Sequence, residues 1–537
     1  MKRFLTLFAF AMMIMTQISC NKSENVAENP FFEPVWETPY GAPPFDRIKT
    51  EHYKPAFERG MSLHNEEIDQ IVNSKEKPTF ENTILAYDNS GETLSRVATV
   101  FGMLSAADTD DEMQALSAEI YPALAAHSDA ITMNDKLFER VKAVYDGRDA
   151  AGLGEQEQRL TKKIYDDFVR SGALLSADDK EALKQINEEL SLLGVQFGRN
   201  LLAETNAYQL FVEKDRLKGV PSGVMEAASA EAKAAGKNDS YLFTLQKSSM
   251  LPFLTYAEDR DLREQIYKAY LMRGNNGNEN DNNSVIAKMV SLRYKKAKLL
   301  GYDSYAHYVT ADQMAGKPEA VYELLEGVWT PALERSQQEL ERMMSIFRRD
   351  HGADAEFESW DWWYYAEKVR QQKYSLNEEN IRQYFSLDNT RQGIFNLANR
   401  LFGITFRPVN VPIYHKEVSA YEVLDKDNSH LGILYFDFHP RAGKGQGAWC
   451  GYYREQRYEA DGTRTAPVVS IVCNFTRPTA SAPSLLTLDE VTTLFHEFGH
   501  ALHFLFTDVR YNGLIGVEGD FVELPSQIME NWALTPE

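Results

Sequence analysis

Apolar residues recur at intervals of three and four along most of the chain between residues 48 and 345, with polar or charged residues between them. The clearest stretches are 120–130, 178–202 and 321–347. This spacing gathers apolar side chains on one side of an α-helix, so we predict helix after helix in this part of the chain. Later the pattern changes to short apolar runs, which predict the strands of a small antiparallel sheet. These runs are 432–438, 447–453 and 467–474. The expected fold class is therefore mainly α with a small sheet.

A further helix is predicted after the last of these strands. Thr487 and Glu490 have the spacing of a capping box, in which each side chain accepts a hydrogen bond from the backbone of the other residue. The helical spacing of apolar residues then resumes with Val491, Leu494, Phe495, Phe498, Ala501, Leu502 and Leu505. Gly499 interrupts this apolar stripe. Because glycine is costly inside a helix, we expect another backbone to approach closely at this position.

Two histidines on this helix have the spacing of metal ligands. His496 and His500 are four residues apart, so their imidazoles lie on one face of the helix. Two neutral imidazoles in that arrangement can bind one tetrahedral Zn²⁺, and Glu497 can reach a water molecule on the metal as a general base. The simpler interpretation is a helix with two hydrogen-bonded histidines and one surface glutamate.

A third ligand is expected from the segment that begins at Asp520. Glu523, Ser526 and Glu530 can share one face of a helix, because seven residues make almost two turns. Glu523 would complete a His₂Glu site with one position left for water. Ser526 or Glu530 would orient a metal ligand through a hydrogen bond without binding the metal. For Glu530 the alternative is a solvated glutamate on the helix surface.

The motifs around these residues resemble a known family. His-Glu-Phe-Gly-His-Ala-Leu-His from His496, followed by Asp-Phe-Val-Glu-Leu-Pro-Ser-Gln from Asp520, is similar to the thimet oligopeptidase and peptidyl-dipeptidase family of zinc metallopeptidases. The bacterial peptidyl-dipeptidases resemble it most. The similarity continues upstream, for example in Phe168-Val-Arg-Ser-Gly-Ala and Val472-Cys-Asn-Phe-Thr, and covers nearly everything after residue 30.

This resemblance implies two largely helical halves flanking a deep channel that admits short, flexible oligopeptides. It also implies one Zn²⁺ per chain and the release of carboxyl-terminal dipeptides, with an endo-acting oligopeptidase as the alternative. We expect a monomer with an N-terminal helical region over residues 30–250 and a zinc peptidase catalytic region over 251–537. Family members continue beyond the position that matches Glu537, so we expect the C-terminal part of the catalytic region to be missing. An inactive peptide-binding lipoprotein is therefore a second alternative.

The first residues predict export. Lys2 and Arg3 precede an apolar run that is too short to span a membrane comfortably and is typical of a signal peptide. The following Gln-Ile-Ser-Cys, ending at Cys20, resembles a bacterial lipoprotein box. We therefore expect a signal peptide over residues 1–19, a lipid on Cys20 and a polar tether over 20–29, with cleavage without lipidation as the alternative. The expected location is the bacterial cell envelope, on its periplasmic face or at the cell surface.

Charge and cysteine content narrow the partners further. The formal net charge is −22 at pH 7 and no basic patch stands out, which argues against nucleic acid because phosphates require a basic face. Besides Cys20, the chain contains Cys450 and Cys473 in neighbouring predicted strands. These two either form a disulfide or remain buried thiols.

Overall fold

The computed structural model describes residues 29–459 and 461–535. The predicted signal peptide, Cys20 and nearly all of the predicted tether lie outside the described residues.

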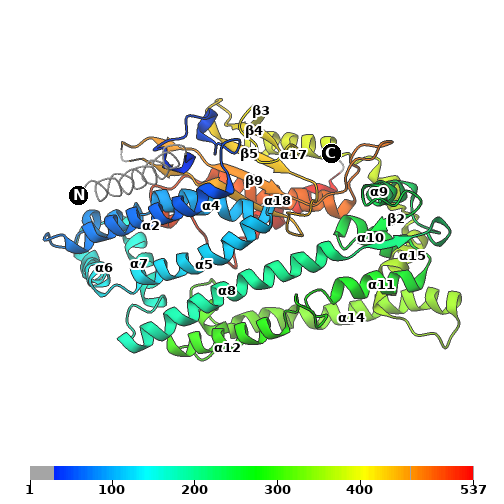
Figure 1. The fold of residues 1–537 in the computed structure, drawn as a ribbon, viewed down its shortest axis with the longest axis horizontal. Coiled ribbons are helices and arrows are strands. Elements are labelled where there is room, and N and C mark those ends of the chain that lie inside the picture. Colours follow the sequence, from blue (N-terminus) through cyan, green and yellow to red (C-terminus); the bar gives the residue numbers. More distant parts are fainter. Residues whose placement is uncertain (1–28, 460, 536–537) are drawn as a thin grey trace, which may run out of the picture.

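Helices make up most of the described chain (Figure 1). The N-terminal part contains α2 (Thr50–Asn73), α3 (Ala86–Asp88), α4 (Glu92–Ala107), α5 (Asp111–Thr132), α6 (Asp135–Gly147), α7 (Glu155–Arg170) and α8 (Ala177–Ala207). The middle part contains α9 (Ser222–Ala234), α10 (Lys247–Tyr256), α11 (Arg260–Leu271), α12 (Asn283–Leu299), α13 (Tyr305–Thr310), α14 (Pro318–His351), α15 (Trp362–Tyr374), α16 (Glu378–Arg382) and α17 (Leu387–Phe402). The last two are α18 (Leu488–Phe506) and α19 (Leu524–Glu530). The mainly helical fold predicted from the sequence is confirmed. Among the described residues, no helix combines the length and apolar character needed to cross a membrane.

The helices are arranged around a small sheet. In Figure 1 the sheet, α17 and α18 lie in the upper part of the molecule, whereas α8, α12 and α14 run lengthwise through the lower part. The helices α5 and α12 both pack against α8, and α2 packs against α4. Gly60 permits the last of these contacts, because a Cβ there would come within 2.9 Å of the Leu94 Cα.

The sheet beside α18 has five strands in the order β3-β4-β5-β9-β6. They are β3 (Thr405–Pro408), β4 (Ser419–Leu424), β5 (His430–Asp437), β6 (Trp449–Arg454) and β9 (Val468–Val472). The sheet differs from the expected antiparallel one in a single pairing, because β5 and β9 run parallel with Ile433 opposite Val468. The reason is the path of the chain, which passes from β5 to the edge strand β6 and then returns to fill the gap with β9. Two-stranded pairs occur at β1 (Leu210–Val212) with β2 (Tyr241–Phe243) and at β7 (Arg457–Tyr458) with β8 (Arg464–Thr465).

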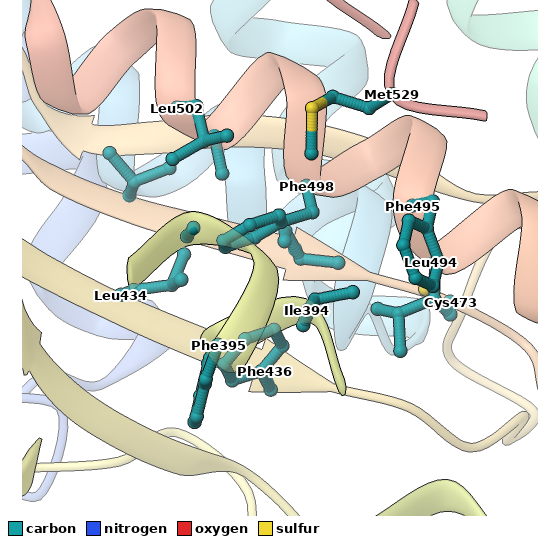
Figure 2. Close-up of a cluster of buried hydrophobic side chains, with 14 of the residues drawn as sticks. Ile394, Phe395, Leu434, Phe436, Cys473, Leu494, Phe495, Phe498, Leu502 and Met529 are labelled. Carbon is teal, nitrogen blue, oxygen red and sulfur yellow. The ribbon is translucent and has the colours of Figure 1, made fainter. Parts of the chain in front are cut away.

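Strand β5 is buried on both faces because its side chains alternate between two cores. Leu434 and Phe436 belong to a cluster formed with α17 and α18, in which Phe498 of α18 packs toward the sheet (Figure 2). Ile433 and Tyr435 belong to a second cluster that includes residues of α2 and α4. Burying one such large apolar side chain contributes about 1.5–3 kcal/mol, so the first cluster holds α18 firmly against the sheet and the second does the same for α2 and α4.

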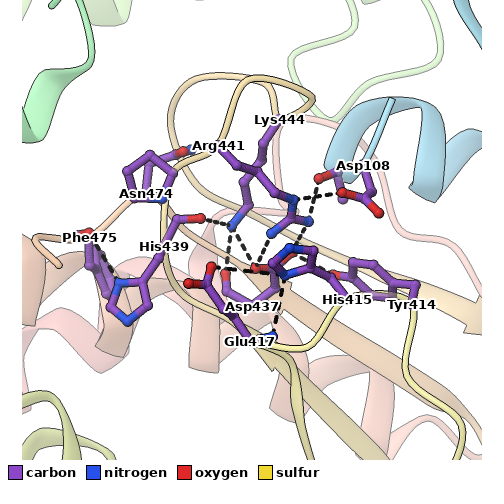
Figure 3. A network of polar contacts seen from close by, with 12 residues as sticks. Asp108, Tyr414, His415, Glu417, Asp437, His439, Arg441, Lys444, Asn474 and Phe475 are labelled. Carbon is purple, nitrogen blue, oxygen red and sulfur yellow. Dashed lines mark hydrogen bonds and ion pairs between the residues drawn. The ribbon is translucent and has the colours of Figure 1, made fainter. Parts of the chain in front are cut away.

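A buried polar network connects the end of β5 to α4 (Figure 3). Asp437 accepts hydrogen bonds from Lys444 Nζ at 2.8 Å and from Arg441 Nη1 at 2.9 Å. Arg441 also donates to Asp108, the residue that follows α4, at 2.8 Å. Burial alone would raise the pKa of Asp437, but the hydrogen bonds from Arg441 and the charge of Lys444 hold it below its ordinary value. The network thereby fixes the loop between β5 and β6.

Candidate metal centre

The start of α18 is fixed by the predicted capping box, which is confirmed. Thr487 Oγ1 accepts from the Glu490 backbone N–H at 3.1 Å, and Glu490 Oε2 accepts from the Thr487 N–H at 2.8 Å. The other oxygen of Glu490 accepts from the N–H of Thr476 at 2.7 Å. Because Thr476 follows β9, these bonds fasten the beginning of the helix to the end of the sheet.

The three residues proposed as metal ligands converge on one point. His496 Nε2 lies 3.2 Å, and His500 Nε2 3.1 Å, from the same Oε2 atom of Glu523. Zinc bonds to nitrogen and oxygen are about 2.0–2.1 Å long, so the donors of a tetrahedral site are about 3.3–3.4 Å apart. The distances therefore fit a zinc-sized ion. Among the described residues, this is the group of histidine, cysteine and carboxylate side chains whose donor atoms come together closely enough to hold a metal.

The protonation of these groups also suits a cation. Burial lowers the pKa of His500, which favours the neutral imidazole. The hydrogen bond from Ser526 lowers the pKa of Glu523, which favours the carboxylate. Neutral imidazole and ionised carboxylate are the forms that bind zinc.

Two further residues form hydrogen bonds with the candidate ligands without being ligands themselves. Glu530 Oε1 lies 2.7 Å from His496 Nδ1, the ring nitrogen that faces away from the cluster. Ser526, which is fully buried, donates its hydroxyl to Glu523 Oε2 at 2.7 Å. These are the positions from which a carboxylate and a hydroxyl can fix the orientation of a ligand.

Glu497 lies beside the cluster in an apolar environment. The residue is 5% exposed, and Oε2 has no hydrogen-bond partner among the described residues. Burial raises the pKa of Glu497 to about 7. Cys450 and Cys473 are free thiols, and burial followed by the charge of Glu497 raises the pKa of both. Both thiols therefore lie near this carboxylate. Of the two alternatives for them, the structure has the free thiols and not the disulfide.

The two helices of the centre touch at Gly499. A Cβ at this position would lie 2.3 Å from the Pro525 carbonyl oxygen and 2.6 Å from the Ser526 Cα. The close approach of another backbone, predicted from this glycine in the apolar stripe, is confirmed. It brings Glu523 and Glu530 within reach of the histidines.

The loop between α18 and α19 has an anchor that sequence reasoning missed. The backbone N–H groups of Asn512 and Gly513 donate to the two carboxylate oxygens of Asp88 at 2.9 and 2.7 Å. Tyr511 is buried, and its hydroxyl donates to Glu157 at 3.1 Å. Asp88 and Asn512 are 424 residues apart, so no local sequence pattern predicts the contact.

An unpaired strand edge lies next to the metal helix. β6 is one of the two edge strands of the sheet, and Tyr452 in it packs against Phe504 of α18 with ring centres 5.3 Å apart. A cavity of about 1840 Å³ is lined by Tyr452 and Arg454 of β6 and by the first residues of α7, among others. Because its lining does not include His496, His500 or Glu523, the predicted channel through the metal centre remains a prediction.

A helix with two histidines around a buried glutamate, converging with a carboxylate as third ligand, defines a candidate metallopeptidase centre. Residues 253–537 match Peptidase family M3, and the chain belongs to this family of metallopeptidases. The chain is 40% identical over 503 residues to a dipeptidyl carboxypeptidase of Salmonella typhimurium, covering 93% of this chain and 73% of that protein. It is 33% identical over 509 residues to an oligopeptidase A of the same organism, covering 93% and 75%. The family and the peptidase function predicted from the sequence are thereby confirmed.

A solved structure has the same fold. The crystal structure titled as an oligoendopeptidase F aligns with a TM-score of 0.51 and 15% identity, covering 91% of this chain and 69% of that one. At this identity the likeness concerns the fold alone.

The expected location in the cell envelope is contradicted. The relatives are dipeptidyl carboxypeptidases and oligopeptidases A, and one from Arabidopsis thaliana is named as cytosolic. None of these names is that of a lipoprotein. The apolar first residues and the Gln-Ile-Ser-Cys motif at Cys20 lie outside the described residues, so the signal peptide and the lipid on Cys20 stay predictions.

Proposed function

We propose that the protein is a zinc peptidase that hydrolyses short, flexible peptides. His496, His500 and Glu523 would hold one zinc ion in a monomeric chain, with Glu530 and Ser526 orienting the ligands. The observation that carries this proposal is the convergence of two imidazole nitrogens and one carboxylate oxygen at 3.1–3.2 Å. The match of residues 253–537 to the peptidase family supports a catalytic region over 251–537, with residues 30–250 as a helical region that covers it.

Glu497 is the proposed catalytic base. Zinc, when bound, polarises the scissile carbonyl and lowers the pKa of the attacking water. Glu497 takes a proton from that water and later passes it to the leaving amine. Its Oε2 atom is free to receive the proton, and a pKa of about 7 allows both uptake and release near neutral pH. A cation close by favours the carboxylate form that the first step requires.

The edge strand β6 is the proposed platform for the substrate. An extended peptide can add to an open sheet edge through main-chain hydrogen bonds. Cys450 of β6 lies near Glu497, and Tyr452 lies farther along α18 against Phe504, so the strand passes along the metal helix. Main-chain contacts do not depend on side-chain identity, which suits a peptidase of broad specificity.

We propose that the enzyme releases carboxyl-terminal dipeptides, as the name of the 40% identical relative indicates for that protein. An endo-acting oligopeptidase is the second candidate, favoured by the 33% identity to oligopeptidase A. Amino-blocked tetrapeptides and their carboxyl-amidated analogues distinguish the two. A free dipeptide from the acid, with slow cleavage of the amide, supports the first candidate. Rapid internal cleavage of the amide supports the second.

The catalytic proposal is tested with Glu497→Gln. The variant should keep its zinc, because it loses no ligand, and should lose at least about 10²-fold in kcat/KM on the tetrapeptide, because it loses the base. Asp489→Asn, an exposed acid-to-amide change on the same helix, is the matched control and should keep its activity. Normal turnover by Glu497→Gln would rule out the proposed base.

A further inference from the structure

Glu523 occupies a position that needs support from outside its own helix. It occupies the position just before α19, which is only seven residues long, and its side chain makes no capping hydrogen bond and is 51% exposed. The loop before it contains, as regular structure, only the single turn Asn512–Leu514. Because Glu523 lies where this loop meets a short helix, the contacts that fix the loop also fix the position of this ligand.

Asp520, three residues before Glu523, ties this loop to a distant segment. Its two carboxylate oxygens accept hydrogen bonds from the backbone N–H groups of Met314 and Ala315, at 3.0 and 2.9 Å. The backbone N–H of Asp520 donates in turn to Gln313 Oε1 at 3.2 Å. Residues 313–315 form the turn between α13 and α14, more than 200 residues away in the chain.

These three bonds define the geometry of the loop. A carboxylate offers both oxygens as acceptors to two parallel N–H groups, and the bonds from Ala315 and Met314 lower the pKa of Asp520. The residue before Asp520 also approaches this turn closely, since a Cβ on Gly519 would lie 2.9 Å from Gln313 Oε1. An amide in place of the carboxylate would present an NH₂ group to one of the two donors.

We infer that Asp520 is a positioning residue, which holds Glu523 within reach of His496 and His500 by anchoring the ligand loop to the turn between α13 and α14. Ser526 and the contact at Gly499 fix α19 locally against α18, whereas Asp520 connects the ligand to the long helices of the lower part in Figure 1. The inference rests on the proposed zinc site. It adds a link between that site and a part of the molecule that contributes no ligand.

The test compares Asp520→Asn with Glu518→Gln, an acid-to-amide change two residues away in the same loop, where the carboxylate makes a 3.9 Å ion pair with the exposed Arg159. Hydrogen exchange of the metal-free chain is measured first. We expect faster exchange in residues 311–317 and 521–530 for Asp520→Asn alone. The dissociation constant for zinc is then measured by competition with a chelator, and we expect it to rise about tenfold in Asp520→Asn, the low end of the effect of residues that orient ligands. Gln313→Ala, which removes the acceptor of the third bond, should change both readouts in the same direction by less.

Each outcome has a definite meaning. Faster exchange without a change in zinc affinity would overturn the positioning role and leave Asp520 as a surface contact. Equal effects from Asp520→Asn and Glu518→Gln would also overturn it, because loss of charge would then be the cause. If the unaltered chain bound no zinc, the proposed function would fail. The anchor would then be judged by exchange in residues 521–530 alone, where unchanged exchange in Asp520→Asn would refute it.

Discussion

Single side chains that bind no metal decide how well the candidate ligands are placed. Glu530 contacts the ring nitrogen of His496 that points away from the cluster, at 2.7 Å. Such a bond selects the tautomer in which Nδ1 carries the proton and leaves Nε2 free to bind a metal.

We predict that Glu530→Gln weakens zinc binding by about tenfold or more, because the amide holds the imidazole less strongly than the carboxylate does. Chelator competition measures the change. Gln527→Ala on the same short helix, where the side chain is exposed, serves as the control and should keep the affinity of the unaltered chain. Equal affinities in all three proteins would show that Glu530 is a solvated surface residue.

The elements around the site depend on how closely α18 and α19 approach. Gly499 permits this approach, since a side chain there would collide with the backbone of Pro525 and Ser526. A collision with backbone atoms cannot be relieved by a change of rotamer, so one helix has to move.

We therefore predict that Gly499→Ala separates α19 from α18 and lowers zinc affinity, although it adds only one methyl group. Gly516→Ala is the matched control, because a Cβ there would meet no atom within 4 Å. Isothermal titration with zinc compares the two variants. Unchanged binding by Gly499→Ala would mean that the helices adjust without moving Glu523.

Much of this element structure was predictable, because its signals are local. The capping box at Thr487, the apolar stripe and the spacing of His496 and His500 lie within one helix, so the sequence alone indicated them. The pairing of β5 with β9 was not predictable in this way, since an entire strand and a hairpin intervene. The anchors at Asp88 and Asp520 were missed for a similar reason. Each binds backbone N–H groups hundreds of residues away, and backbone groups leave no mark in the sequence.

At the scale of the whole molecule, the network around Asp437 joins the sheet to the N-terminal helices. Both Asp437 and Lys444 have fully buried side chains, and Arg441 extends the network to the end of α4. Removing one member of a buried ion pair leaves the other charge without compensation, which is strongly destabilising.

We predict that Asp437→Asn lowers the free energy of unfolding by roughly 3–5 kcal/mol at pH 7. Because the pKa of Asp437 is depressed below 3.8 in the folded protein, its stabilising contribution is present above that pH and is lost as the pH falls through the folded pKa. The difference in free energy of unfolding between the unaltered protein and Asp437→Asn should therefore be constant near neutrality. It should narrow only below pH 3.8. Urea unfolding at several pH values measures it, with Asp427→Asn on an exposed turn as the control. A gap that narrows already between pH 7 and 5 would contradict this assignment.

The central claim is that His496, His500 and Glu523 hold one zinc ion. The most direct measurement is the zinc content per chain after removal of free metal, determined by plasma mass spectrometry for the unaltered protein and for Glu523→Ala, with Glu518→Ala as the control. We predict one zinc per chain in the unaltered protein and in the control, and a large loss in Glu523→Ala. Zinc that is absent from the unaltered protein, or that is retained in full by Glu523→Ala, would contradict the claim.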